Sequence, residues 1–224
     1  MLTYSPASPK IFSSSSLAIF ITPHRSTRSK FKRGLDIAGS IFGLMILAIL
    51  FIPIAIAIKL DSPGSILYKQ KRCGLRGRSF ILYKFRTMIK NAEALKSQVK
   101  NEAEGAIFKN ENDFRVTRVG RFLRRTSLDE LPQFWNVLVG EMSLVGTRPP
   151  TLDEVVYYSD RHWRRLNVKP GITGEWQVNG RSTVKNFEDI ITLDLRYQHR
   201  WSPWYDLWLI IKTIWIVIAK QGAY

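Results

Sequence analysis

The feature that most constrains this chain is the apolar run from Ile37 to Ile58, IAGSIFGLMILAILFIPIAIAI, which contains no charged residue. As an α-helix these 22 residues would be about 33 Å long, close to the thickness of the hydrocarbon core of a bilayer. A helix in the core of a soluble protein normally carries a polar stripe, and this run has none. The run therefore predicts a helix embedded in a membrane.

The flanks of this run leave its topology open. Residues 1–35 and residues 62–92 are both rich in lysine and arginine, and neither segment contains an acid. A spanning helix usually has a basic flank on its cytoplasmic side only. Pro53 lacks an N–H and crowds the carbonyl four residues earlier, which favours a kink or a break. Two interpretations remain at this point: a broken helix that enters and leaves on one side, and a kinked helix that spans.

Composition narrows the class of protein. The 224 residues are enough for one domain, and 34 basic against 18 acidic residues give a net charge of +16. That charge indicates an anionic partner: nucleic acid, an acidic membrane surface or a phosphorylated substrate. A nucleic-acid-binding protein has no use for the apolar run. Cys73 is the only cysteine and the three histidines lie far apart, which argues against an intrachain disulfide and structural zinc.

The pattern along the chain predicts a mostly helical α+β protein with a single membrane-associated domain. Residues 1–30 form a Ser-rich basic tail, residues 31–60 the membrane helix and residues 61–224 the remaining domain. The expected elements of that domain are a β-hairpin (Ser65–Lys71 and Ser79–Arg86), a polar helix (Asn91–Lys100), a helix (Gln133–Val139), a loop with one short strand (Asn167–Gly180) and an amphipathic helix (Val184–Arg200).

The C-terminal segment is apolar and rich in tryptophan. Leu207–Ala219 is too short to span a bilayer, and it is interrupted by Lys212. Tryptophan favours the headgroup region, so we expect a helix lying in the membrane interface. Burial in the core of the domain is the alternative.

The chemistry is expected at Asp129 and Glu130, which follow a segment with five arginines, residues 115–125. One interpretation is helix capping, with Asp129 as the N-cap and Glu130 in the first turn. The other is catalysis, because arginines lie near Gly/Pro turns elsewhere in the chain: Arg124, Arg125, Arg148 and Arg181. Arginine matches phosphate in charge and geometry, and paired carboxylates can hold Mg²⁺. Together with the apolar run, these residues indicate phosphoryl transfer to or from a lipid. A non-enzymatic membrane scaffold would leave the acid pair unexplained.

Four segments closely resemble the bacterial sugar transferase family of monotopic phosphoglycosyl transferases. They are KRGLDIAGS (32–40), YKQKRCGLRGRSFILYKFRTM (68–88), TRVGRFLRRTSLDELPQFWNVLVGEMSLVGTRPP (117–150) and VKPGITGEWQVNGRS (168–182). The resemblance implies transfer of a sugar 1-phosphate from a UDP-sugar to polyprenyl (undecaprenyl) phosphate, with release of UMP. This reaction is the first membrane step in the assembly of exopolysaccharide, capsule, O-antigen or glycan.

The resemblance also implies roles for individual residues. Asp129 would form a covalent phospho-sugar intermediate, and Mg²⁺ would be held by Glu130 and Asp129. Pro53 would break a re-entrant helix. Substrate-binding positions would be Arg124, Arg148, Arg181, Asp194, Lys84 and Arg86. Thr147 stands where many relatives have proline.

For its setting, the resemblance implies a monotopic protein on the cytoplasmic face of the bacterial inner membrane. The chain is similar to the short catalytic-core type, without the spanning helices and extra domain of longer members. The expected partners are the UDP-sugar, polyprenyl phosphate and anionic membrane lipid, with a second copy of the chain and downstream glycosyltransferases as further candidates. No nucleic acid is expected.

Overall fold

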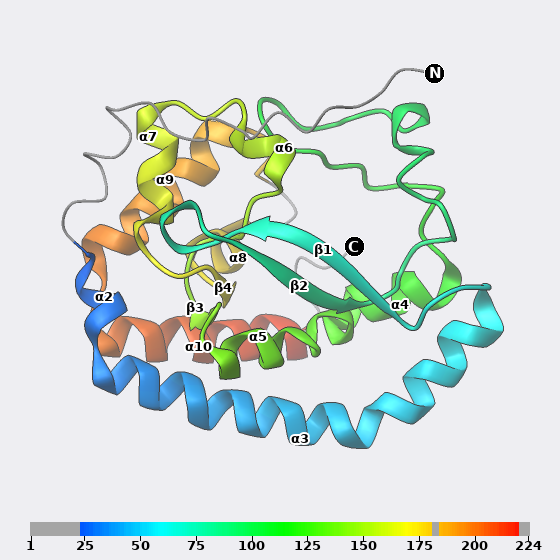
Figure 1. Ribbon diagram of the computed structural model, residues 1–224, viewed down its shortest axis with the longest axis horizontal. Helices are drawn as coiled ribbons and strands as arrows, with labels where there is room; N and C mark the ends of the chain where they lie inside the picture. The colour runs from blue at the N-terminus through cyan, green and yellow to red at the C-terminus, as the bar shows by residue number, and fades with distance from the viewer. Residues whose placement is uncertain (1–22, 181–183, 220–224) are drawn as a thin grey trace.

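The computed structural model describes residues 23–180 and 184–219, and shows a mostly helical α+β domain as predicted (Figure 1). Its helices are α2 (Arg25–Arg28), α3 (Lys30–Asp61), α4 (Arg118–Thr126), α5 (Gln133–Val139), α6 (Leu152–Val155), α7 (Asp160–Trp163), α8 (Glu175–Gly180), α9 (Phe187–Arg200) and α10 (Pro203–Ile218). Its strands are β1 (Leu67–Cys73), β2 (Ser79–Phe85), β3 (Ser143–Val145) and β4 (Gly171–Thr173). Most of the predicted tail, residues 1–22, lies outside the described residues.

The apolar run forms most of α3, a helix of 32 residues and therefore about 48 Å long. Its N-terminus is capped by the Ser29 side chain, which accepts a hydrogen bond from the Lys32 backbone N–H. The predicted break at Pro53 is not present: α3 continues through this residue, and Figure 1 shows the helix bending in its C-terminal part. A helix can lose one backbone hydrogen bond at proline and relieve the ring's clash by kinking, without separating into two arms.

Both ends of α3 are attached to the same domain. Near the N-terminus, Lys32 forms a buried ion pair with Asp206 at 2.8 Å. Near the C-terminus, the Asp61 carboxylate accepts a hydrogen bond from the backbone N–H of Val119 at 2.9 Å. Between them, α3 packs against α5, and a Cβ added at Gly43 would lie only 2.4 Å from a ring atom of Phe134. The helix therefore lies along the domain instead of projecting from it.

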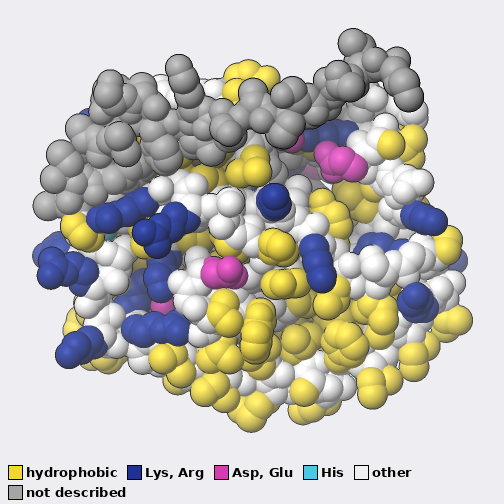
Figure 2. Space-filling view, in the orientation of Figure 1, with side chains coloured by type: hydrophobic (Ala, Val, Ile, Leu, Met, Phe, Trp, Pro, Cys, Tyr) yellow, Lys and Arg dark blue, Asp and Glu magenta, His cyan; other side chains and the backbone are white. Residues whose placement is uncertain are grey.

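The side of α3 that faces away from the domain is exposed and apolar. Its exposed large side chains are Phe31, Ile37, Ile41, Phe42, Met45, Ile49, Ile52, Ile56 and Leu60. Figure 2 shows hydrophobic side chains gathered along the lower edge of the molecule, where α3 runs. Within the described part of the chain, α3 is the one helix long and apolar enough to cross a membrane. Soluble monomers rarely expose so large an apolar surface.

The predicted hairpin is confirmed. Strands β1 and β2 pair antiparallel, from Leu67 opposite Phe85 to Cys73 opposite Ser79, so the first strand lies two residues later than expected. A second small sheet joins β3 and β4 in parallel. The backbone after β3 packs closely against the start of β4: a Cβ on Gly171 would lie 2.1 Å from the backbone nitrogen of Gly146.

Other predictions are confirmed or corrected element by element. Helix α5 has the predicted bounds, and α9 begins three residues later than expected because Asn186 caps it. The polar helix predicted at Asn91–Lys100 is wrong: the segment forms turns and a short 3₁₀ helix, and Asn91 has a left-handed backbone with φ 62°. The segment predicted as a loop with one strand contains β4 and also α8.

The C-terminal helix α10 has one side in the core, as in the second alternative, while its predicted place in the membrane interface stays a prediction. Leu209 is fully buried in a core cluster with Val145 and Tyr197. The opposite side of α10 is apolar but exposed, and includes Trp204 and Trp215. The helix therefore contributes to the core while presenting tryptophans outward.

Candidate active site

The two acids lie on a short 3₁₀ turn between α4 and α5. Ser127 ends α4 in a left-handed conformation, with φ 57°, and redirects the chain into the turn Leu128–Glu130. Leu128 and Leu131, on either side of the acids, pack with the core that joins α3, α4 and β2. This packing holds Asp129 almost fully buried, at 4% exposure, while Glu130 is partly exposed.

The capping interpretation of Asp129 is wrong. The next helix, α5, begins at Gln133, and its N-cap residue is Pro132, which makes no side-chain cap hydrogen bond. The turn that contains Asp129 has Ser127 at its N-cap position. Asp129 is therefore the N-cap residue of neither helix.

Lys84 lies directly beside the dyad, the pair of acids Asp129 and Glu130. Its ammonium group, carried by β2, contacts the Glu130 carboxylate at 2.9 Å, and both side chains are partly exposed. Strand β2 thus places a cation next to Glu130, and a role of Lys84 in substrate binding stays a prediction. An anionic group of a substrate could replace Glu130 as the ion-pair partner of Lys84.

Arg86 and Arg124 are held by other protein groups. The Arg86 guanidinium donates to the carbonyl oxygens of Ser62, at 2.7 Å, and of Ile58, at 3.3 Å, so it caps the C-terminus of α3. This contact gives Arg86 a structural role that the sequence did not reveal. Arg124, in the last turn of α4, donates from Nε to the Thr87 hydroxyl at 3.0 Å.

Arg148 is fixed in the loop after β3. Its guanidinium forms two hydrogen bonds to the Glu154 carboxylate, at 2.8 and 3.0 Å. Arg72, which the sequence analysis did not single out, donates to the carbonyl of Pro149 at 3.0 Å. Burial and the positive charge of Arg148 lower the pKa of Arg72 to about 10, while Glu154 and Glu130 act in the opposite direction. Arg72 therefore lies within electrostatic reach of Arg148 and also of Glu130.

Asp194 lies behind this loop and does not line it. It forms a buried ion pair with Arg165, and burial raises the pKa of its carboxyl to about 6 despite that partner. Arg165 in turn donates to the backbone carbonyl of Arg148 at 3.2 Å. The structure therefore connects Asp194 to the site through Arg165, another residue that sequence reasoning missed. The predicted substrate residue Arg181 lies outside the described residues.

The donor set at the dyad suits Mg²⁺ shared with a substrate. In the two described ranges, no group of three or more His, Cys, Asp or Glu side chains is placed to hold a metal by itself. Mg²⁺ commonly binds one or two protein carboxylates and completes its coordination with phosphate oxygens and water. Asp129 and Glu130 can provide such a pair, and the nearby arginines can contact the phosphates.

These features define a class of protein: one with an exposed apolar helix lying along a domain whose site is suited to phosphorylated, anionic ligands. The family model described as bacterial sugar transferase matches residues 27–220. The chain belongs to the bacterial sugar transferase family.

Curated relatives share this region at high identity. A galactosyl transferase, CpsE, from Streptococcus agalactiae is 48% identical over 86% of this chain and 43% of its own length. An undecaprenyl-phosphate galactose phosphotransferase from Salmonella typhimurium is 40% identical over 96% of this chain and 46% of its own length. The exopolysaccharide production protein ExoY from Rhizobium meliloti is 38% identical over 86% of this chain and 88% of its own length. The chain thus spans less than half of the first two relatives and most of the third.

Proposed function

We propose that this chain transfers a sugar 1-phosphate from a UDP-sugar to a polyprenyl phosphate, namely undecaprenyl phosphate, and releases UMP. The observation that carries the proposal is the buried Asp129 next to the Glu130–Lys84 pair, with Arg72 within electrostatic reach of Glu130. The names of relatives support the substrates: the Salmonella protein is named for undecaprenyl phosphate and galactose, and one from Escherichia coli, 37% identical, for UDP-glucose and undecaprenyl phosphate. The reaction would begin exopolysaccharide, capsule, O-antigen or glycan assembly.

The first step uses Asp129 as a nucleophile. A carboxylate oxygen of Asp129 attacks the β-phosphorus of the UDP-sugar, and a new oxygen–phosphorus bond forms. The bond between this phosphorus and the bridging oxygen breaks, and its electron pair leaves with UMP. Asp129 then carries the sugar phosphate as a mixed anhydride.

The second step regenerates the enzyme. A phosphate oxygen of the polyprenyl phosphate attacks the same phosphorus, and the bond to Asp129 breaks. The products are a polyprenyl diphosphate sugar and a free carboxylate. Asp129 is only 4% exposed, and this burial limits access of water, which would otherwise hydrolyse the intermediate.

The cations around the dyad stabilise the phosphates in both steps. Lys84 releases Glu130 and contacts a phosphate oxygen, while Arg148 and Arg124 provide further positive charge. Arg72 positions the loop that carries Arg148 through its bond to Pro149. When bound, Mg²⁺ would be held by Asp129 and Glu130 and would neutralise charge on the diphosphate.

We further infer that α3 enters the membrane and returns on the same, cytoplasmic side. The support is geometric: Lys32 and Asp61, at opposite ends of α3, both bind the domain that carries the dyad. A helix that crossed the bilayer could not have both ends attached to one face of one domain. The exposed apolar side of α3 and the tryptophans of α10 would then contact lipid, consistent with a monotopic protein of the inner membrane.

Cysteine labelling tests this topology. Lys30→Cys and Ile66→Cys, each in a Cys73→Ser background, should both be protected from an impermeant thiol reagent in intact cells. Both should be labelled after lysis. Labelling of only one of the two in intact cells would show that α3 spans the membrane.

Turnover tests the reaction. Purified protein with Mg²⁺ and undecaprenyl phosphate should release UMP from at least one member of a panel of UDP-sugars, and omission of the acceptor should limit release to about one UMP per chain. Absence of UMP release over the whole panel would contradict the proposal. The nucleic-acid alternative would instead be supported by tight, strongly salt-dependent binding of duplex DNA.

A further inference from the structure

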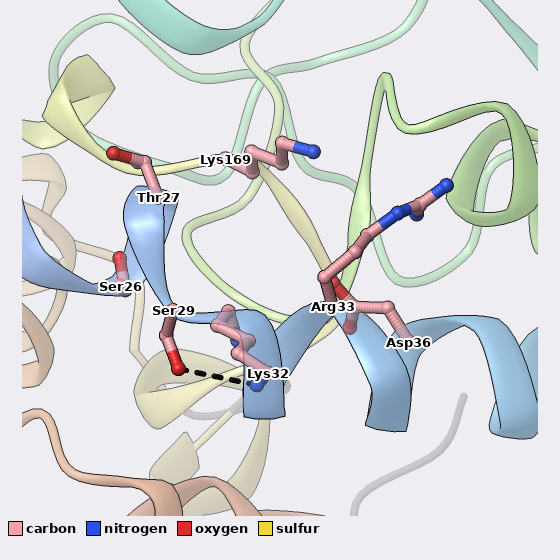
Figure 3. A pocket seen from close by; sticks show the side chains of 7 residues that line it. All are labelled: Ser26, Thr27, Ser29, Lys32, Arg33, Asp36 and Lys169. Carbon is pink, nitrogen blue, oxygen red and sulfur yellow. Dashed lines mark hydrogen bonds between the residues drawn. The ribbon is translucent and has the colours of Figure 1, made fainter.

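A second electropositive site lies at the N-terminal end of α3, away from the dyad. It is a cavity of about 120 Å³, roughly the volume of four water molecules. Hydroxyl side chains of Ser26, Thr27 and Ser29 line one part of it, and charged side chains from α3 and from Lys169 line the rest (Figure 3). The dyad and this cavity lie at opposite ends of α5, because Glu130 precedes this helix and Arg33 binds its C-terminal carbonyls.

Two cationic side chains line this cavity, and their charged groups lie close together beside Gly140. A Cβ placed on Gly140 would lie 3.5 Å from the ammonium nitrogen of Lys169 and 3.7 Å from a guanidinium nitrogen of Arg33. The two charged groups are therefore within about 7 Å of each other, and Figure 3 shows both side chains extending in the same direction. Like charges this close repel, and an anion between them would remove the repulsion.

Both cations have hydrogen-bond donors to spare. Arg33 uses two of its five N–H groups, donating to the carbonyls of Val137 and Leu138 at 2.8 and 2.7 Å. In the part of the chain that the structure describes, Lys169 has no ion pair within 4 Å. Burial and the positive charge of Arg33 lower the pKa of Lys169, and Asp36 only partly offsets them.

The one acid that lines the cavity, Asp36, and the third cation, Lys32, both have partners in the protein. The Asp36 carboxylate accepts from the Ser143 hydroxyl at 2.8 Å and from the backbone N–H of Leu144 at 2.9 Å. The Lys32 ammonium is paired with Asp206. An incoming anion would therefore meet the free donors of Arg33 and Lys169.

The position of the cavity relative to the membrane indicates which kind of anion it binds. The exposed apolar side of α3 begins at Phe31, within the same turn as Ser29 and Lys32. If this side contacts acyl chains, the cavity lies at the level of lipid headgroups, where phosphate is the abundant anion. Further basic residues, Arg25 and Arg28, lie on α2 beside it.

We propose that this cavity binds the headgroup phosphate of an anionic phospholipid, with Lys169 and Arg33 as its cationic contacts. The site would fix the N-terminal end of α3 at the membrane surface and so help to orient the domain on the bilayer. The inference rests on the membrane orientation proposed above but not on the reaction. Failure of the UMP-release assay would leave it standing.

The test measures binding of dioctanoyl phosphatidylglycerol to the full chain in uncharged detergent micelles. Lys169→Gln should weaken binding at least about tenfold, as expected for loss of a charge-assisted hydrogen bond. Lys59→Gln, which removes an equal charge from an exposed position at the other end of α3, should change it less than about twofold. Lys169→Arg should retain binding within about threefold, because it keeps the charge. Unchanged binding in Lys169→Gln, or an equal loss in Lys59→Gln, would overturn the site.

Two other ligands distinguish the source of the phosphate. Dioctanoyl phosphatidylcholine should bind at least about tenfold more weakly than phosphatidylglycerol, because its own cation competes with Lys169. Equal, Lys169-dependent binding of both lipids would overturn selectivity for anionic lipid. Binding of inorganic phosphate that depends on Lys169, without binding of phosphatidylglycerol, would show that the ligand is a free anion and not a lipid. Lys169→Gln should retain the wild-type circular dichroism spectrum, since among residues 23–180 and 184–219 the Lys169 side chain has no ion-pair partner to lose.

Discussion

Replacement of Asp206 by Asn should strongly destabilise the protein, because it breaks a buried network at the N-terminal end of α3. Asp206 is fully buried and pairs with Lys32 at 2.8 Å. It also accepts hydrogen bonds from the Tyr197 hydroxyl at 2.8 Å and from the Trp201 indole N–H at 3.0 Å. The substitution preserves the shape of the side chain but leaves the ammonium group of Lys32, which is 5% exposed, without its ion-pair partner.

The magnitude follows from the cost of an uncompensated buried charge. Removing one partner of a buried ion pair typically costs about 3–5 kcal/mol of the free energy of unfolding. For a chain of this size, each kcal/mol lowers the melting temperature by about 2–4 °C, so the apparent melting temperature should fall by roughly 6–20 °C. Asp189→Asn, at an exposed position on α9, should cost no more than about 0.5 kcal/mol.

Thermal unfolding in detergent micelles, followed by circular dichroism at a fixed scan rate, measures these effects. The double variant Lys32→Met, Asp206→Asn should be more stable than Asp206→Asn alone, because the uncompensated charge has been removed. A melting temperature for Asp206→Asn within about 2 °C of wild type would refute the reasoning. The reasoning would also be refuted if the fall in melting temperature of the double variant equalled the sum of the falls measured for Asp206→Asn and for Lys32→Met alone.

Three further predictions address the dyad, the packing of α3 and the single thiol. Glu130→Gln should lower turnover and raise the Mg²⁺ concentration needed for half-maximal UMP release, and an unchanged Mg²⁺ dependence would exclude Glu130 as a ligand. Gly43→Leu should destabilise the protein by about 1–3 kcal/mol, because its Cβ would lie 2.4 Å from the Phe134 ring, whereas Gly34→Leu, with nothing within 4 Å, should not destabilise it in a melting experiment. Burial raises the pKa of the Cys73 thiol to about 11, so only about one thiol in a thousand is ionised at pH 8. Maleimide should therefore label Cys73 only after unfolding in detergent such as dodecyl sulfate, and rapid labelling of the native protein would contradict its burial.

The elements that the sequence predicted well are those fixed by local pattern. Helix α5 has the predicted bounds, and the hairpin follows from two alternating runs around a Gly-rich turn. The apolar run correctly predicted the long helix, but not its continuity through Pro53. Whether proline breaks or bends a helix depends on packing around it, here of Ile54 and Ile58 in the core with Phe85, and no local pattern records such packing.

In the candidate site too, some residues stand out from local pattern and others depend on the fold. The acids Asp129 and Glu130 stood out because they are adjacent and follow an arginine cluster. The positioning roles of Arg72 and Arg165 did not, because each depends on contacts with residues far away in sequence, such as the carbonyl of Pro149 or the carboxylate of Asp194. Only the fold brings these groups together.

Arg86 is the opposite case. The family resemblance placed it among the substrate-binding residues, and in the structure its guanidinium donates to carbonyls at the C-terminal end of α3. The signal that could have identified this role is the unsatisfied carbonyl groups that every helix C-terminus presents. A sequence does not show which side chain satisfies them.

The most direct test of the central claim is whether Asp129 carries the sugar phosphate. Wild-type protein incubated with a UDP-sugar that supports turnover, in the absence of polyprenyl phosphate, should gain the mass of one sugar phosphate, and peptide mapping should place it on Asp129. Asp129→Asn should gain no mass, should fold normally, and should lose UMP release by several orders of magnitude. A sugar phosphate attached to a different residue, or turnover by Asp129→Asn above about a tenth of the wild-type rate, would contradict the account.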